Sequence, residues 1–91
     1  MDNMSKLIKR NKLAPWQEMD EQALVLTPKK STVHELNETA TWIWKRLNGD
    51  RTLESIQIEM CEVFDIEPNQ ARNDLYQLIN DMSEKGMILD C

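Results

Sequence analysis

The sequence predicts an α+β domain with a winged-helix-like arrangement, in which three N-terminal antiparallel strands are followed by three helices. Branched side chains gather in short runs before residue 37, as is typical of strands. After that point apolar residues recur at spacings of three and four, which indicates helices. Only a few residues separate the second and third helical patterns, as in a helix-turn-helix. A chain of 91 residues has room for one hydrophobic core.

The first residues of the chain are polar and basic. Within residues 1–12, Leu7 and Ile8 are the apolar anchors, and we expect a flexible arm, with a short helix as the alternative. The folded domain is then expected over residues 13–91.

Three strands are expected next. Residues 14–19 suit an edge strand, because a proline near the start of a strand is tolerated there. A turn at residues 20–21 leads to a second strand over residues 23–27, which is rich in branched side chains. Residues 28–31 form a loop of hairpin length. The third strand, residues 32–36, is short and polar enough to lie at the edge of the sheet.

The three helices have recognisable ends. Asn37 and Thr52 are the expected N-caps of the first and second helices, because their side-chain oxygens can accept hydrogen bonds from first-turn N–H groups. Pro68 begins the third helix, where its missing N–H costs nothing. Gly49 and Gly86 are the expected stops of the first and third helices.

The third helix carries the longest apolar stripe of the chain, which we expect to face the core. The stripe consists of Ala71, Leu75, Leu78, Ile79 and Met82. Residues 87–89 are apolar again and predict a short extended segment that packs back on the domain.

The distribution of charge argues against a nucleic-acid partner. The net charge is −5, and residues 59–91 hold only Arg72 and Lys85 against eight Asp and Glu. A helix-turn-helix protein places its second helix in the major groove and neutralises phosphates with Lys and Arg. Here that helix is acidic, so a duplex would be repelled.

No catalytic, metal-binding or cofactor-binding motif is present. His34 is the only histidine, and with the distant Cys61 and Cys91 it supplies neither a metal cluster nor a disulfide framework. We therefore expect a protein that is not an enzyme and needs no cofactor. No apolar run is long enough to span a bilayer and no secretory signal follows the basic start, so a cytoplasmic location is the default.

Peptide binding is the remaining possibility that the residues themselves suggest. An edge strand at residues 32–36 would offer unpaired backbone groups to an extended peptide, and a neighbouring helix could select its side chains. The alternative is that a polar edge strand flanked by lysines is merely protected against aggregation. The residues alone weigh these two interpretations evenly.

Several motifs together resemble the PqqD family. They are Pro15-Trp16, Val33-His34-Glu35-Leu36-Asn37-Glu38-Thr39-Ala40, Ile43-Trp44, Leu47 with Gly49, Thr52-Leu53 with Ile56, the helix start at Pro68, Asp74, and Glu84-Lys85-Gly86-Met87-Ile88. The resemblance runs from about residue 13 to residue 89. It departs from the family pattern at residues 27–31, which lack the glycine common in that turn.

The resemblance implies a small non-catalytic peptide chaperone with three strands and three helices. Such a protein binds the leader segment of a ribosomally synthesised precursor peptide by strand addition. It then presents the peptide to a modifying enzyme, often a radical S-adenosylmethionine enzyme. The leader would pair with the third strand and lie beside the third helix.

Carried onto this chain, the resemblance names seven candidate peptide-binding residues. The strand positions are Thr32, Val33, His34 and Glu35, and the helix positions are Arg72, Asp74 and Tyr76. Asp74 matches an acid of the family pattern, whereas Arg72 and Tyr76 flank the apolar stripe on its other side. Which flank faces the cleft stays open, and Tyr76 is equally compatible with a packing role.

Two alternative functions remain. One is a winged helix-turn-helix regulator that binds nucleic acid, against which the acidic third helix argues. The other is an interaction domain that dimerises through the same edge strand, so that the chain is either a monomer or an edge-strand dimer.

Overall fold

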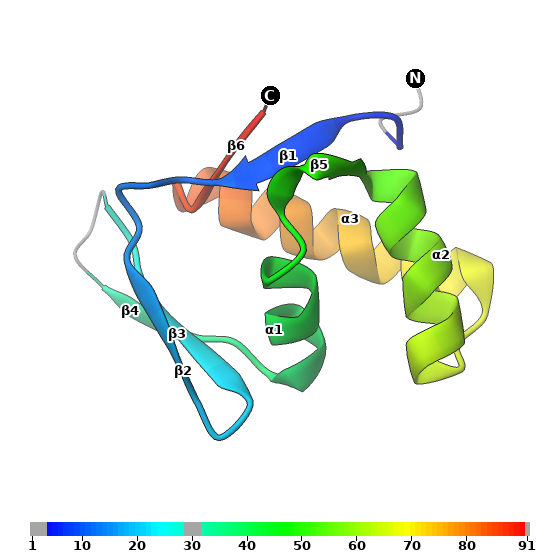
Figure 1. Cartoon of the computed structure of the whole chain (residues 1–91), viewed down its shortest axis with the longest axis horizontal. Helices are drawn as coiled ribbons and strands as arrows, with labels where there is room; N and C mark the ends of the chain where they lie inside the picture. Colours follow the sequence, from blue (N-terminus) through cyan, green and yellow to red (C-terminus); the bar gives the residue numbers. More distant parts are fainter. Residues whose placement is uncertain (1–3, 29–31, 91) are drawn as a thin grey trace.

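The computed structural model describes residues 4–28 and 32–90, which form nine elements packed around one core (Figure 1). The strands are β1 (Leu7–Arg10), β2 (Trp16–Met19), β3 (Gln22–Leu26), β4 (Val33–Glu35), β5 (Asn48–Thr52) and β6 (Ile88–Asp90). The helices are α1 (Glu38–Trp44), α2 (Leu53–Phe64) and α3 (Pro68–Glu84). The predicted fold class is confirmed, since antiparallel strands at the N-terminal side precede three helices.

The first sheet has the order β2-β3-β4 and contains the three strands that the sequence predicts. A two-residue turn joins β2 to β3, and both of its residues, Asp20 and Glu21, have positive φ angles of 51° and 67°. Two consecutive left-handed residues match the twist of a tight hairpin. Residues 29–31, which belong to the expected loop between β3 and β4, lie outside the described part of the chain.

A second sheet, of order β5-β1-β6, includes residues 7–10, for which the sequence predicts part of a flexible arm; residues 1–3 of that expected arm lie outside the described part of the chain. The central strand of this sheet is β1, paired on one side with β5 and on the other with β6. Ile8 is 2% exposed and Met4 is 3% exposed, so both are part of the core. The strand forms because its backbone bonds to segments far away in the sequence; Arg10 N–H, for example, donates to Leu47 O (2.9 Å). Directly after the strand, Asn11 N–H donates to Met87 O (2.9 Å).

The expected end of the first helix at Gly49 is also corrected. The helix ends at its C-cap Lys45, and the chain turns directly into β5. Gly49 has a φ of 87° and lies in β5, where the pairing with β1 is irregular. A glycine suits such a bulge because it adopts positive φ without a steric cost.

The other predicted helix ends are confirmed. The Asn37 side chain accepts a hydrogen bond from Ala40 N–H (2.8 Å), and Thr52 Oγ1 accepts one from Ser55 N–H (3.1 Å). Pro68 is the first residue of α3. Gly86, with a φ of 73°, ends α3 in a left-handed cap in which Met87 N–H donates to Met82 O (2.9 Å).

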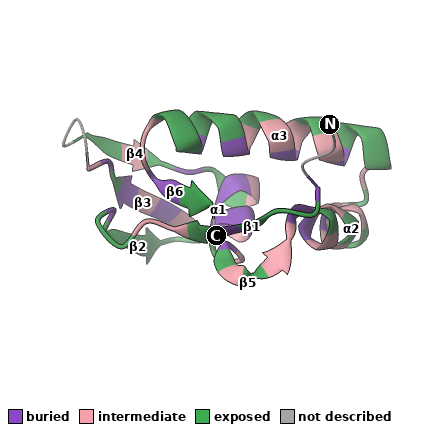
Figure 2. Cartoon of the chain, turned by 90° about the horizontal axis from the view of Figure 1, so that it is seen from above, coloured by how far each residue is buried: buried purple, intermediate pink, exposed green. Residues whose placement is uncertain are grey.

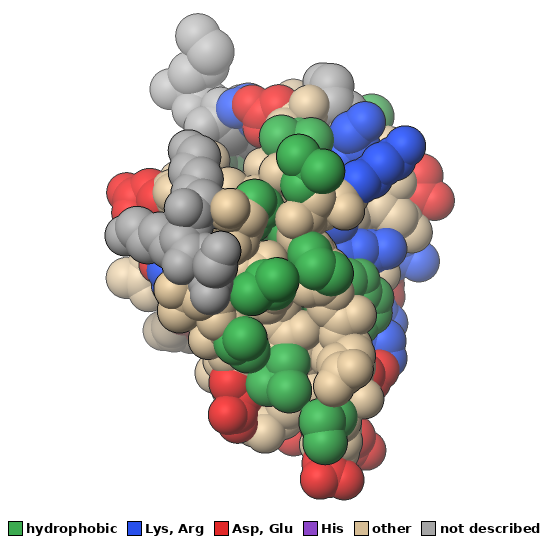
Figure 3. Space-filling model, turned by 90° about the vertical axis from the view of Figure 1, so that its left-hand side faces the viewer, with side chains coloured by type: hydrophobic (Ala, Val, Ile, Leu, Met, Phe, Trp, Pro, Cys, Tyr) green, Lys and Arg blue, Asp and Glu red, His purple; other side chains and the backbone are tan. Residues whose placement is uncertain are grey.

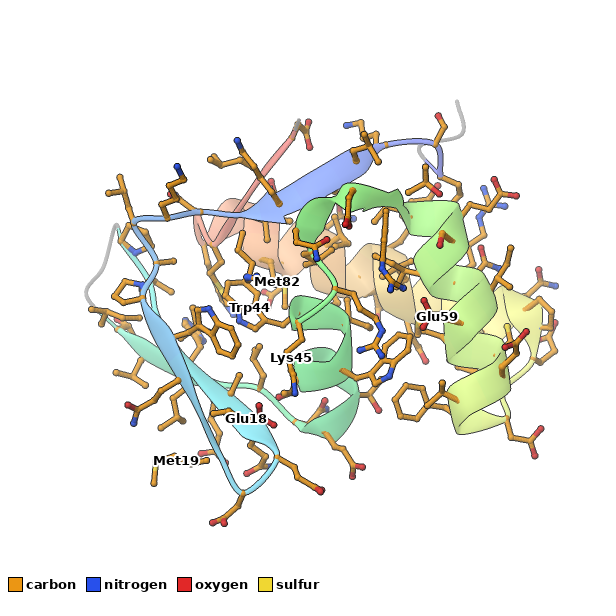
Figure 4. The ribbon with its side chains drawn as sticks, in the orientation of Figure 1. Glu18, Met19, Trp44, Lys45, Glu59 and Met82 are labelled. Carbon is orange, nitrogen blue, oxygen red and sulfur yellow. The ribbon has the colours of Figure 1, made fainter. Side chains whose placement is uncertain are left out.

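The core lies where the helices and the two sheets meet. Figure 2 shows the buried residues of α3 along the side that faces the rest of the molecule. Trp44 of α1 and Met82 of α3 are buried at the centre (Figure 4). Leu75 of α3 is fully buried as well. The ring of Trp16 meets that of Trp44 edge-on, with centroids 5.9 Å apart, so the hairpin is packed onto α1. Residue 87 is buried and β6 pairs with β1, so the predicted extended segment does pack back on the domain.

Candidate peptide-binding groove

Strand β4 is an edge strand, as the sequence predicts, and its hydrogen bonds to β3 define which of its backbone groups are used. The two strands pair with Val25 opposite His34. At one end Thr27 N–H donates to Thr32 O (2.8 Å), and at the other end Leu36 N–H donates to Ala23 O (2.8 Å).

Bonded and non-bonded pairs alternate along an antiparallel ladder, so the free edge of β4 can be assigned residue by residue. Thr32, His34 and Leu36 direct their backbone groups toward β3. Val33 and Glu35 therefore direct their N–H and C=O groups toward the open edge. The side chains of Val33 and Glu35 are both exposed, so neither shields these backbone groups from an incoming strand.

The end of β4 is attached to α1 by the hydroxyl of Thr41. This side chain is 3% exposed, and its Oγ1 accepts a hydrogen bond from Ala23 N–H (2.9 Å) while donating to Leu36 O (3.2 Å). The hydroxyl thus stands between two backbone groups that would otherwise bond to each other. It holds the chain at the point where it leaves β4 and enters α1.

A groove of about 200 Å³ lies between this end of β4 and α3. Its apolar residues are Leu36, Ala40, Leu78, Met82 and Met87, all of them buried except the half-buried Leu78. Polar residues complete it, namely His34, Glu35, Asn37, Asp81 and Lys85. The groove therefore has the composition of a small recognition site, with an apolar floor and a charged rim.

Asp74 lies on the flank of α3 that faces this groove. Asp74, Leu78, Asp81 and Lys85 follow one another at spacings of four, three and four residues, so they share one side of the helix. Three of these four line the groove. Of the strand candidates, His34 and Glu35 line the groove, whereas Thr32 and Val33, like Asp74, do not. Asp74 lies one turn before Leu78 on the same flank of α3.

Arg72 and Tyr76 lie on the opposite flank of α3, and the structure does not bring them to β4. Tyr76 lines a second hollow of about 340 Å³, together with Ile79 and residues of β1 and β6. The guanidinium carbon of Arg72 stands 5.5 Å from the centre of the Tyr76 ring, so the two candidates contact each other.

Of the residues that line the groove, only His34 and Glu35 are candidate peptide-binding residues in the sequence. The groove residues of α3, among them Leu78, Asp81 and Lys85, are not. Asp81 follows Leu78 by three residues and Lys85 follows Asp81 by four, a helical spacing that is visible in the sequence. It becomes informative only once the flank that faces β4 is known.

The outer face of the same sheet is apolar as well (Figure 3). Pro15, Leu24, Leu26 and Val33 line a shallow depression on it. Val33 and Leu26 are directly opposite each other across the two strands, with exposed fractions of 59% and 37%. The side chains of a strand added to β4 would therefore meet apolar surface on the outer face and the groove on the inner face.

Two further kinds of site were sought in the described ranges, residues 4–28 and 32–90. No three His, Cys, Asp or Glu side chains there lie close enough together to hold a metal ion. No helix in those ranges is long and apolar enough to cross a membrane.

These features define a small α+β, winged-helix-like domain with an open edge strand beside its third helix. Residues 22–88 match the family described as Coenzyme PQQ synthesis protein D (PqqD). The chain belongs to the PqqD family, which confirms the resemblance seen in its motifs.

Two solved structures share this fold, and no protein with a curated description matches the chain by sequence. One is described as lasso peptide synthetase B1 complexed with the leader peptide; it has a TM-score of 0.81 and 20% identity, and the match covers 91% of this chain and 98% of that one. The other, TbiB1 in complex with the TbiA(beta) leader peptide, has a TM-score of 0.80 and 18% identity, over 88% and 93% of the two chains.

Proposed function

We propose that the chain is a non-catalytic peptide chaperone that binds the leader segment of a ribosomally synthesised precursor peptide. The leader adds as a strand to the open edge of β4 and lies in the groove beside α3. The observation that carries this proposal is the open backbone of Val33 and Glu35 next to that groove. Backbone pairing supplies affinity, and the groove supplies selectivity.

Similar proteins support this function. Both solved structures that share the fold are described as complexes with leader peptides, and the family membership is consistent with such a role. The chain would hold the leader while a modifying enzyme acts on the rest of the precursor. A radical S-adenosylmethionine enzyme is the type of partner that the family resemblance implies.

The proposal is tested by calorimetric titration of the full chain with the leader of the precursor peptide encoded beside it. We expect binding at micromolar concentration or tighter. Val33→Pro removes an N–H that points to the open edge and leaves the bonds between β3 and β4 in place. It should weaken binding by about tenfold or more, because the peptide loses a hydrogen bond and meets the proline ring.

Glu18→Pro is the matched control. The bond from Leu26 N–H to Pro15 O (2.9 Å) and the register of β2 with β3 place the Glu18 N–H at the other open edge of the same sheet. This variant introduces the same kind of change far from the groove, and its affinity should equal that of the unmodified chain. Absence of binding to any neighbouring precursor would contradict the proposed function.

Gel filtration tests the alternative function, in which the chain dimerises through the edge of β4. If the edge of β4 pairs with a second copy, the chain elutes as a dimer and Val33→Pro converts it to a monomer. If the edge is reserved for a peptide, both proteins elute as monomers.

A further inference from the structure

The groove beside β4 contains an ion pair of its own. Lys85 Nζ lies 2.8 Å from Asp81 Oδ2, and both side chains line the groove. Their exposed fractions are 32% and 54%. An ion pair as open to solvent as this one is weak, and a competing charge can replace one of its members.

Apart from this pair, the side of α3 that faces β4 is acidic. Asp74 Oδ1 accepts a hydrogen bond from the neutral side chain of Gln70 (2.8 Å), and no Lys, Arg or His within residues 4–28 and 32–90 forms an ion pair with it. Glu35 borders the groove from β4, but its side chain shares the outer face of the sheet with Val33, so its carboxylate does not contribute to the charge inside. Among the described residues that line the groove, Lys85 is the only Lys or Arg, and its charge is already directed at Asp81. Because Asp81 and Lys85 balance each other, the carboxylate of Asp74 leaves this side of α3 with a net negative charge, which attracts a cation.

The geometry of a strand added to β4 determines which peptide residues reach this groove. Peptide residues opposite Val33 and Glu35 point to the outer face, whereas the residue opposite His34 points inward, as do those two positions away. Successive inward residues are about 6–7 Å apart. Along the axis of α3, Asp81 and Asp74 are about 4.5 and 6 Å from Leu78. One inward side chain can thus contact the apolar floor while the next one reaches a carboxylate.

We propose that the peptide accepted by this groove carries a large apolar side chain and a Lys or Arg two residues apart. The apolar side chain packs on Leu78 and Met82, and the cation binds Asp81 in place of Lys85. This inference rests on the proposed function and specifies its ligand. It assigns opposite roles to two neighbouring residues, because Asp81 attracts the peptide and Lys85 competes with it.

Because the two residues have opposite roles, removing each charge should change the affinity for the leader in opposite directions. Full-length chains with Asp81→Asn or Lys85→Met are titrated with the leader of the neighbouring precursor in a fluorescence anisotropy assay. Asp81→Asn should weaken binding about three- to fivefold, and Lys85→Met should strengthen it about two- to fivefold. Raising the salt concentration should weaken binding to the unmodified chain more than binding to Asp81→Asn.

Lys45→Met is the matched control for loss of a lysine charge. Lys45 Nζ binds Glu18 Oε1 at 3.0 Å in another exposed ion pair (Figure 4), on the β2 side of the sheet. Its removal should leave affinity unchanged. If Lys85→Met weakens binding and Asp81→Asn strengthens it, the peptide is anionic there and the inference is overturned. Binding that neither variant changes overturns it as well, whereas absence of any binding overturns the proposed function.

A peptide library gives the same answer without a known leader. Random 12-residue peptides displayed on phage are selected on the immobilised full chain. Recovered peptides should carry Lys or Arg at least about three times as often as Asp or Glu two residues from a large apolar residue. Selection on a chain with Asp74→Asn and Asp81→Asn should remove this excess. An equal content of both charges in peptides that bind the unmodified chain would contradict the inference and leave the proposed function intact.

Discussion

The two flanks of α3 both face the edge strand of a sheet, yet they differ in what they offer. On one flank, Leu78 and Asp81 lie beside β4, whose open backbone groups border the groove. On the other, Tyr76 and Ile79 lie beside β6 and line the larger hollow. There Lys6 Nζ and Asp90 Oδ2, which line the same hollow, bind each other at 3.2 Å.

The difference shows how one helix can serve packing and recognition at the same time. Ile79, on the β6 flank, is 8% exposed and belongs to the core. On the β4 flank Leu78 is only half-buried and is followed by exposed charge. The buried stripe between the flanks fixes the rotation of α3, and that rotation determines which side chains face β4.

Removal of the buried stripe should have the largest effect, because both flanks depend on it. Leu75 is fully buried in the middle of α3. Leu75→Ala should lower the free energy of unfolding by about 2–5 kcal/mol through lost contacts and the cavity left behind. Urea denaturation followed by circular dichroism measures this change. Leu13→Ala, at a position that is 74% exposed, should change stability by less than about 0.5 kcal/mol. Equal effects would show that α3 is not held by this stripe.

A smaller effect is expected from the hydroxyl that shapes the β4 side alone. Thr41→Val keeps the volume of the side chain but leaves Ala23 N–H and Leu36 O without the partner they have now. An unsatisfied buried polar group costs about 1–3 kcal/mol. The free energy of unfolding should fall by that amount in thermal and urea denaturation. Leader affinity should also fall, because the end of β4 is no longer fixed.

The half-exposed Thr39 of the same helix provides the control for Thr41. Thr39→Val should change neither stability nor affinity appreciably. If Thr41→Val is as neutral as Thr39→Val, then the bridging hydroxyl does not position β4.

Features set by neighbouring residues could be predicted from the sequence. The caps at Asn37 and Thr52, the tight turn before β3 and the stop at Gly86 each depend on a few adjacent residues, and the structure has all of them. The edge position of β4 could also be predicted locally, because the segment is short and largely polar. The family match then confirmed the overall arrangement.

Features set by distant residues could not be predicted. Strand β1 has a single buried side chain, Ile8, and therefore no alternating pattern. It exists because β5 and β6, which come much later in the chain, supply partners for its backbone. The same limit applies to α3: its sequence shows two polar flanks, but only tertiary packing determines that Asp74 faces β4 and Tyr76 does not.

One pair of substitutions shows most directly which flank of α3 binds the peptide. Leu78→Ala shortens a half-buried side chain of the β4 groove, whereas Tyr76→Ala shortens a half-buried side chain of the β6 hollow. Leu78→Ala should weaken leader binding by about 5- to 30-fold, corresponding to about 1–2 kcal/mol of lost apolar contact. Tyr76→Ala should lower stability but leave the affinity of the folded chain unchanged. Calorimetric titration of both variants with one leader peptide measures the difference. The reverse result, with affinity lost only in Tyr76→Ala, would move the peptide to the edge of β6 and the other flank of the same helix.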